Sequence, residues 1–212
     1  AVLREDGRVD LFVNQAKLDD AVRVHLGDAV SVHPVEQFAL ALQGLTGPVR
    51  VDKGTAPLAV ADLLRGAGVE VVWGDDPCRL PKACKNPAEI AATREAHLRD
   101  GAAMVEFLRW LDEASPSGAL TEISVVQALE GFRRATNALH DISFDTICGA
   151  GPHGAIMHYR VTEETNRPVG RNELLLVDSG AQFLDGTTDI TRTIAIGDPG
   201  PEARECYTRV LQ

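Results

Sequence analysis

The chain has 212 residues, of which 44% are hydrophobic and 5% aromatic, a composition typical of soluble globular proteins with a substantial core. Its formal net charge of -10 and pI of about 5.0 argue against nucleic acid or an anionic membrane surface as a partner, because both require clustered Lys and Arg. Its apolar runs are far shorter than the roughly 20 residues that span a bilayer, and no signal peptide opens the chain, so we expect a cytoplasmic protein.

Residues 1–82 alternate short β-rich runs with helical segments. We expect strands at 8–14, 30–34, 48–53 and 69–73, and helices at 18–27, 36–45 and 56–68. Such alternation predicts an α/β domain with a largely parallel or mixed sheet. No glycine-rich phosphate loop joins a strand to a helix here, so a nucleotide site is not supported.

A segment with three prolines and no hydrophobic period, residues 75–87, predicts a linker, and we place the domain boundary between residues 82 and 83. Asn86, Pro87 and Glu89 then give an N-cap, a proline at the first helical position and an acid at the third, which together predict a helix to about residue 113. Its core face should be formed by the apolar residues at mostly helical intervals, namely Ile90, His97, Met104, Val105, Leu108 and Leu111. Thr121 is the N-cap candidate of a second helix, which carries Ile123, Val126, Leu129 and Phe132.

From residue 141 onward the pattern changes to strands. We expect them at 143–151, 154–161, 173–180 and 187–197, followed by a helix over 201–212. Helices followed by an antiparallel sheet make an α+β unit, so residues 83–212 should form a second domain. The four cysteines, Cys78, Cys84, Cys148 and Cys206, lack the paired spacing of a zinc site and should be free thiols.

Asp178 and Asp189 interrupt two runs that otherwise read as half-buried strand. Because aspartate is depleted in strands, each carboxylate needs a partner. The turn signal Asp185-Gly186 lies between them. In an antiparallel hairpin closed by a loop with an even number of residues, their odd separation of 11 positions places both on one face.

A shared face does not yet make a shared site. If Asp185 and Gly186 were the central turn residues, Asp189 would pair with Gln182, roughly 13 Å along the strand from Asp178. A common site therefore requires a different register, through a wider loop or a bulge at residues 179–180.

The chemistry of the two aspartates leaves two interpretations open. Carboxylates on one apolar face repel each other, and a divalent metal would resolve the repulsion because carboxylate oxygens are good ligands for such ions. The alternative is that one aspartate pairs with Arg192 or accepts hydrogen bonds from turn amides.

The segment VDSGAQFLDGTTDITRT, preceded by GPHGAIMHY, resembles the catalytic domain of the Xaa-Pro aminopeptidases. These enzymes have the pita-bread fold shared with prolidase, creatinase and methionine aminopeptidase. LTEIS, FRR, ISFDTI, ETNRPV and GPEARECYTRVLQ are similar to the multi-domain cytosolic form, so the resemblance covers residues 86–212. The residues before them resemble its second creatinase-like amino-terminal domain. The implied fold class is a creatinase-like α/β domain followed by the first half of a pita-bread domain.

The resemblance implies roles for individual residues. Asp178 would chelate one metal ion, and Asp189 would bridge both ions of a dinuclear centre, with Mn²⁺ favoured and Zn²⁺ or Co²⁺ as alternatives. His158 would lie in the substrate pocket and bond the peptide near the scissile bond; on spacing alone it would be a structural histidine bonded to a backbone carbonyl. His153, where related sequences more often carry Asn, is expected to be a surface-loop residue without a role. Arg160 could alter preference at the pocket rim.

The implied function is metal-dependent removal of the first residue from peptides with proline at the second position, by a parent enzyme that is a homodimer. The family's centre needs one His and two Glu ligands more, and none is found in this chain. The chain also lacks an initiator Met and stops within an amphipathic helix, so we expect an internal fragment that is inactive alone. The alternatives are a prolidase-type Xaa-Pro dipeptidase, a non-catalytic pita-bread homologue that binds peptides or proteins, and an unrelated metal-free α+β interaction domain.

Overall fold

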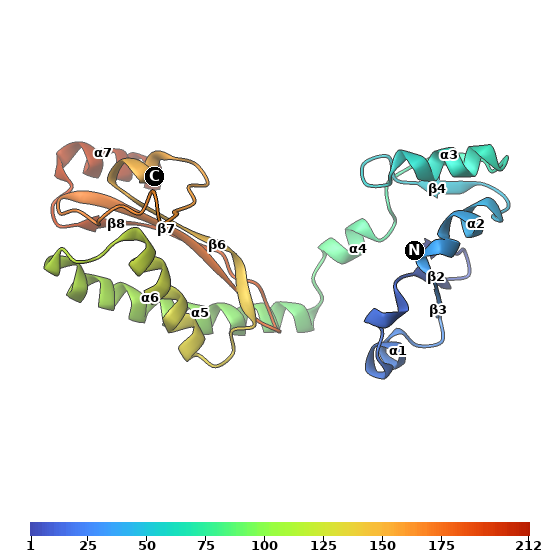
Figure 1. Ribbon diagram of the computed structural model, residues 1–212, viewed down its shortest axis with the longest axis horizontal. Coiled ribbons are helices and arrows are strands. Elements are labelled where there is room, and N and C mark those ends of the chain that lie inside the picture. Colours follow the sequence, from blue (N-terminus) through green and yellow to red (C-terminus); the bar gives the residue numbers. More distant parts are fainter. The chain divides into compact units, whose positions relative to one another are not determined.

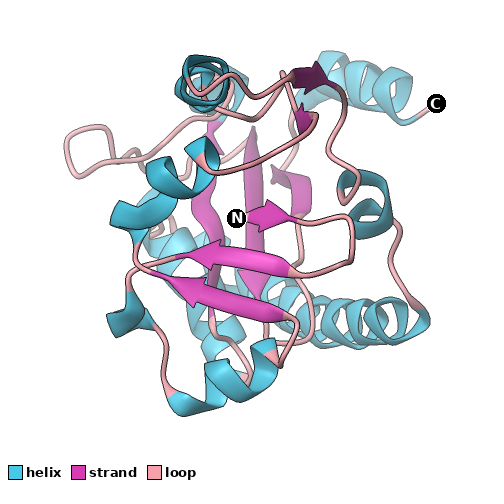
Figure 2. Ribbon diagram, turned by 90° about the vertical axis from the view of Figure 1, so that its right-hand side faces the viewer, coloured by secondary structure: helices cyan, strands magenta, loops and turns pink.

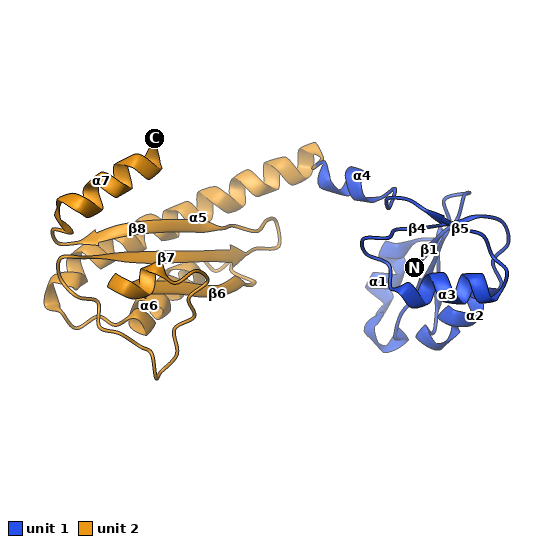
Figure 3. Ribbon diagram, turned by 90° about the horizontal axis from the view of Figure 1, so that it is seen from above, with its two compact units in different colours: residues 1–84 blue, residues 85–212 orange.

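The computed structural model describes residues 1–212, which form two compact units, residues 1–84 and residues 85–212 (Figures 1 and 3). None of the helices combines the length and the apolar character needed to cross a membrane. The four cysteines are free, as predicted.

The first unit alternates strands and helices. Its elements are β1 (Val2–Leu3), β2 (Val9–Phe12), α1 (Asp20–Leu26), β3 (Val30–His33), α2 (Phe38–Gln43), β4 (Val49–Val51), α3 (Leu58–Gly66), β5 (Val71–Trp73) and α4 (Arg79–Ala83). The pairs β2–β3 and β4–β5 are parallel and β1 pairs with β2 antiparallel, so the predicted mixed α/β arrangement is confirmed. Figure 2 shows β2 and β3 as neighbouring arrows that point the same way. The core consists of Leu42, Val51, Leu64 and Val69.

The predicted linker 75–87 is not wholly irregular, because it contains the short helix α4. Asp76 starts it, since its carboxylate accepts a hydrogen bond from the Cys78 backbone N–H at 2.8 Å. Pro81 is tolerated there because it lies in the first turn, where a backbone N–H has no helical acceptor.

The second unit packs its first two helices on one face of an antiparallel sheet, which confirms the predicted α+β arrangement (Figure 1). Its elements are α5 (Pro87–Ala114), α6 (Glu122–Ala135), β6 (Asp141–Ala150), β7 (Glu173–Gln182), β8 (Ile190–Ile196) and α7 (Gly200–Leu211), and the strand order is β6-β7-β8. Both predicted helix starts are confirmed, with capping boxes at Asn86 and Thr121.

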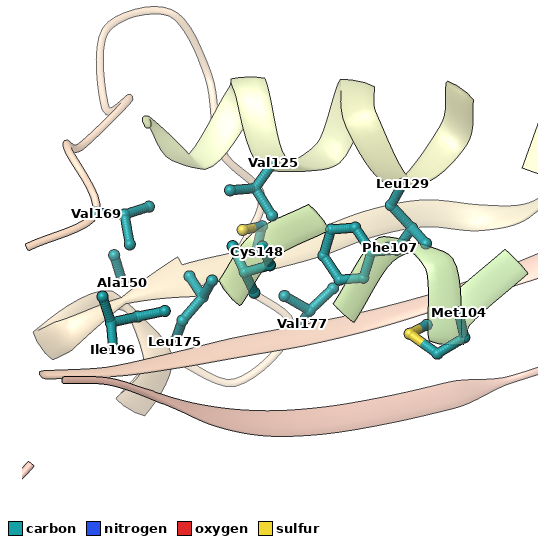
Figure 4. Packing of buried hydrophobic residues seen from close by; sticks show 11 residues of the cluster. Met104, Phe107, Val125, Leu129, Cys148, Ala150, Val169, Leu175, Val177 and Ile196 are labelled. Atoms are coloured by element: carbon teal, nitrogen blue, oxygen red, sulfur yellow. The ribbon is translucent and has the colours of Figure 1, made fainter. Parts of the chain in front are cut away.

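The core of this unit lies between α5, α6 and the sheet. Figure 4 shows Phe107 of α5 and Leu129 of α6 packed toward Val177 of β7. Side chains alternate along β7, so that Leu175 and Val177 are buried in this core. Leu174, Leu176 and Asp178, on the other face, are half-buried.

The predicted core face of α5 is partly wrong. Ile90 and Val105 are 41% and 66% exposed, and His97 is exposed as well. The buried side chains of α5 are Ala96, Asp100, Ala103, Met104, Phe107 and Leu111. The prediction combined residues from two faces of the helix, because it selected the large apolar residues. It omitted the small alanines and the aspartate that are in fact buried. Likewise, α6 buries Glu122, Val125, Leu129 and Arg133.

The predicted strand at 154–161 is also wrong. Gly151–Ala155 form the 3₁₀ helix η4, and His158 follows in a turn with a left-handed φ of 54°. The glycines and Pro152 permit this tight turn where a strand would need an extended backbone.

Candidate metal centre

The hairpin formed by β7 and β8 keeps one register on both sides of a short break at residues 188–189. Asp178 lies opposite Thr191, and an isolated bridge joins Gln182 to Thr187. Both pairings are closed by the same two-residue loop, residues 184–185. The turn centred on Asp185-Gly186 that the local sequence favours is therefore wrong by one position.

Contacts with α5 explain this shift of the turn. The Asp185 carboxylate accepts two hydrogen bonds from the Arg99 guanidinium, each 3.0 Å long. Gly186 packs so closely on α5 that an added Cβ would lie 2.9 Å from the Ala96 Cβ. These tertiary contacts select a loop that the Asp-Gly pair alone would not choose.

The shifted register brings the two predicted ligands together. Asp189 falls opposite Gly180, two positions from Asp178 on the same face of the sheet. Diagonal neighbours of this kind are about 7–8 Å apart between Cα atoms. The register differs from that of a turn at Asp185-Gly186, as a common site would require, but the expected wider loop or bulge at residues 179–180 of the β7–β8 pair is wrong.

Neither aspartate carboxylate forms an ion pair. Asp178 Oδ1 accepts a hydrogen bond of 2.8 Å from Thr191 Oγ1, and Asp189 is exposed. Arg192 donates to the Thr191 carbonyl at 2.8 Å, so the interpretation that it pairs with one of the aspartates is wrong. Two uncompensated carboxylates on one sheet face offer the hard oxygen donors that divalent cations bind.

Asp178 and Asp189 offer two such donors. No group of three or more His, Cys, Asp or Glu side chains in it could hold a metal ion. Two carboxylates are fewer than the ligand set of a dinuclear site, because affinity and geometry come from the complete set. The residues fit a metal centre as part of that set.

The loop that carries His158 folds over the same face of the sheet. An added Cβ at Gly149 would lie 2.7 Å from the Gly154 backbone nitrogen, and one at Gly154 would lie 3.5 Å from the Leu176 Cβ. Leu176 shares its face with Asp178. The end of β6 and η4 therefore rise on the side of the sheet that bears the two aspartates.

His158 itself is exposed, and its ring makes no hydrogen bond, so the alternative of a histidine bonded to a backbone carbonyl is not observed. Its left-handed backbone is uncommon for a residue with a side chain. It makes no hydrogen bond with either aspartate. Arg160, two residues on, forms an exposed ion pair with Asp145.

The buried carboxylate of Glu122 holds this loop in place through hydrogen bonds. Glu122, at the start of α6, is fully buried, and its Oε1 accepts from the Ala150 N–H and bonds His153 Nδ1, both at 2.8 Å. Its Oε2 accepts from Tyr159 Oη at 3.2 Å and from the Arg167 N–H at 3.1 Å. One side chain thus ties α6 to both ends of the loop.

The prediction that His153 is a surface residue without a role is wrong. Its ring lies against Tyr159, with centroids 4.6 Å apart and the ring planes tilted by 38°, while it bonds Glu122. Burial raises the pKa of Tyr159, and the Glu122 charge acts in the same direction, so the phenol stays a hydrogen-bond donor.

Two of the quoted motifs therefore build the support of the loop. LTEIS supplies Glu122, and ETNRPV supplies Arg167, which donates to the Ala150 carbonyl and to Glu173, both at 2.9 Å. Periodicity alone places Glu122 in the first turn of an exposed helix. The motif match was the only signal in the sequence that pointed to these residues.

Comparison with known proteins gives two domain matches. Residues 91–212 match metallopeptidase family M24, and residues 1–89 match the creatinase/prolidase N-terminal domain. A probable Xaa-Pro aminopeptidase P of Laccaria bicolor is 38% identical over 96% of the chain, and aminopeptidase P2 of Arabidopsis thaliana is 45% identical over 98%. The chain spans 33% and 34% of these two proteins.

A solved structure agrees with these matches. The X-prolyl aminopeptidase of Caenorhabditis elegans superposes with a TM-score of 0.83 and is 32% identical, with 91% of this chain and 33% of that one covered. That protein is described as a cytosolic enzyme with a di-nuclear active site.

Proposed function

We propose, from the premise that this chain belongs to metallopeptidase family M24, that it is part of an enzyme that removes the first residue from peptides with proline at the second position. The observation that carries the proposal is the pair of uncompensated carboxylates, Asp178 and Asp189, on one face of the M24 sheet. The named relatives are Xaa-Pro aminopeptidases, and the chain covers about a third of each.

The fold class supports this assignment. The expected creatinase-like α/β domain followed by the first part of a pita-bread domain is confirmed by the two domain matches and by the superposition on the nematode enzyme. Fold alone does not give activity, so the proposal depends on the site residues.

In this proposal Asp178 and Asp189 would be two of the residues that hold the metal ions. Two bound divalent ions would polarise the scissile carbonyl and lower the pKa of a water molecule that attacks it. Thr191 orients the Asp178 carboxylate through its hydroxyl, which leaves the second carboxylate oxygen free for a metal. The remaining ligands, one His and two Glu, come from residues outside this sequence.

His158 binds the substrate in this proposal. The loop rises on the aspartate side of the sheet, and the exposed ring has no protein partner, so both ring nitrogens are available to a peptide. We assign it the role of bonding the peptide near the scissile bond. The Glu122 network holds the loop and so keeps the ring in place.

We further propose Mn²⁺ as the resident metal, a cytosolic location and a homodimeric enzyme. The description of the nematode relative as a cytosolic enzyme with a di-nuclear site supports the location and the number of ions. The preference for Mn²⁺ and the dimer rest on the resemblance to the Xaa-Pro aminopeptidases.

The test is hydrolysis of Xaa-Pro peptides by the full-length protein with added Mn²⁺. Asp178→Asn and Asp189→Asn should each lower kcat/KM at least 100-fold, because each removes an anionic ligand. His158→Ala should lower it with metal content unchanged. Asp198→Asn, an exposed aspartate of the same unit, is the matched control and should leave the rate unchanged.

Substrate length separates this proposal from a prolidase. The proposed enzyme cleaves tripeptides and longer peptides with proline second, whereas a dipeptidase acts on the dipeptide alone. No hydrolysis of any Xaa-Pro peptide by a preparation with both metal ions bound would refute the proposal.

A further inference from the structure

Thr188, the residue before Asp189, breaks the regular β7–β8 ladder. Residues 181 and 188 face each other, and a regular hydrogen-bonded antiparallel pair would exchange two backbone N–H···O=C bonds. Here the Thr188 N–H donates to the Ala181 carbonyl at 2.9 Å, but the Ala181 N–H donates to the Thr188 hydroxyl at 3.0 Å. The hydroxyl has replaced the backbone carbonyl as acceptor.

The displaced Thr188 carbonyl has a defined position of its own. It accepts a hydrogen bond from Ser143 Oγ of β6 at 3.1 Å. An added Cβ at Gly180 would lie 2.2 Å from this carbonyl and 2.0 Å from Ser143 Oγ, so only glycine fits opposite Asp189. The peptide group that leads into Asp189 is therefore fixed by β6 and not by the ladder.

A buried ion pair sets the role of the Thr188 hydroxyl. The hydroxyl donates its single proton to Asp100 Oδ2 at 2.6 Å, which leaves its lone pairs for the Ala181 N–H. Asp100 is held by the Arg133 guanidinium through bonds of 2.7 and 3.1 Å. All three side chains are at most 1% exposed.

Stabilisation of the fold does not by itself explain why the Asp100–Arg133 ion pair is buried here. Desolvation of two buried charges commonly offsets their attraction, so apolar residues of similar volume would stabilise the unit as well or better. Arg133 Nη1 is buried without a hydrogen-bond partner, which adds to the cost. The ion pair does provide a fixed acceptor, the Asp100 carboxylate, for the Thr188 hydroxyl. Thr188 directly precedes the predicted metal ligand Asp189.

We propose that Asp100, Arg133 and Thr188 are positioning residues that orient Asp189 toward the metal centre. Arg133 fixes the Asp100 carboxylate, Asp100 fixes the rotamer of Thr188, and the turned peptide of Thr188 aims the Asp189 side chain. The inference rests on the proposed function, because it assumes that Asp189 binds metal.

The experiment measures Mn²⁺ binding to the full-length protein and three variants, with free Mn²⁺ followed by its electron paramagnetic resonance signal. Thr188→Val keeps the shape and removes the hydroxyl, and it should weaken the binding of at least one Mn²⁺ by about 10- to 100-fold, as loss of an outer partner does. Thr188→Ser restores the hydroxyl and should bind within threefold of wild type. Leu111→Ala removes a buried side chain that lies 11 residues beyond Asp100 on α5, about 16 Å along the helix, so it lowers stability without removing a bond of Thr188.

Each outcome decides the proposal. Unchanged Mn²⁺ affinity in Thr188→Val, or equal weakening in Leu111→Ala, would overturn it. If Thr188→Val does not fold, Ser143→Ala tests the same peptide group and should weaken Mn²⁺ binding several-fold, whereas unchanged binding refutes the role. If the wild-type protein binds no Mn²⁺, the proposed function itself is refuted. If the wild type binds Mn²⁺ and the Thr188→Val variant binds it equally well, only the positioning role is refuted.

Discussion

Replacing Glu122 by Gln is the sharpest test of the loop support. The carboxylate of Glu122 accepts four hydrogen bonds, two at each oxygen. A glutamine keeps one oxygen and presents an NH₂ group to the donors that faced the other. If the Oε1 side is kept, the Arg167 N–H loses its acceptor, while the Tyr159 hydroxyl turns to the Thr165 carbonyl at 3.3 Å.

The expected cost is about 2–5 kcal/mol, because a buried donor without an acceptor costs about 1–3 kcal/mol and a charged acceptor is lost as well. At a slope of about 2 kcal/mol per molar urea this moves the unfolding midpoint by about 1–2.5 M. Fluorescence of Trp110, which lies 6.0 Å from Phe107 between ring centroids, follows this unit, and Trp73→Phe removes the other tryptophan.

The loop should open together with this loss of stability. Tryptic cleavage after the exposed Arg160 should be faster in Glu122→Gln than in wild type, because the loop is no longer tied to α6. Glu130→Gln, also on α6 but in a partly exposed pair with Arg134, is the control and should stay within about 0.5 kcal/mol of wild type. A midpoint within 0.3 M of wild type, at roughly 0.6 kcal/mol on the same slope, would refute the role of Glu122.

Three further predictions concern the same unit. Gly186→Ala should destabilise by about 1–3 kcal/mol because no methyl group fits against α5, whereas Gly101→Ala, inside α5 with open space around it, should stabilise by about 0.5–1 kcal/mol in the same urea assay. Burial raises the pKa of the Cys148 thiol to about 12, aided by a nearby negative charge, so at pH 8 a disulfide reagent should titrate the other three thiols of the native chain and not this one. The hydrogen bonds from Arg99 lower the pKa of Asp185 below 3.8 in the folded chain. The Arg99–Asp185 ion pair therefore stabilises the hairpin fully above about pH 4, and this stabilisation is lost as the pH falls through the folded-state pKa of Asp185. The difference in unfolding free energy between wild type and Asp185→Asn should shrink over the same pH range.

Element starts were predictable because their causes are local. The capping boxes at Asn86 and Thr121 lie within four consecutive residues, so the sequence shows both partners of each bond. The alternation of strands and helices in the first unit is equally local, and it gave the right fold class. Capping and periodicity need no knowledge of what packs against the element.

The buried charges were not predictable from such patterns. Asp100 and Arg133 are 33 positions apart, and each reads as solvent-exposed helix surface until the partner is known. Charged residues are almost never fully buried unless they are paired, so the prior favours exposure at every single position. Glu122 misleads in the same way, because its partners come from β6 and from the loop after it.

The turn between the two aspartates shows why local preference failed at the position that matters most. An Asp-Gly pair favours a turn in which both central residues have positive φ, yet neither Leu184 nor Asp185 has a positive φ in the observed loop. The hairpin accepts this less favourable loop because Asp185 then reaches Arg99 and Gly186 fits against α5. A turn one residue later would shift the register by two positions and separate the aspartates. The contacts of one helix with the hairpin tip thus decide whether two carboxylates can share one metal centre.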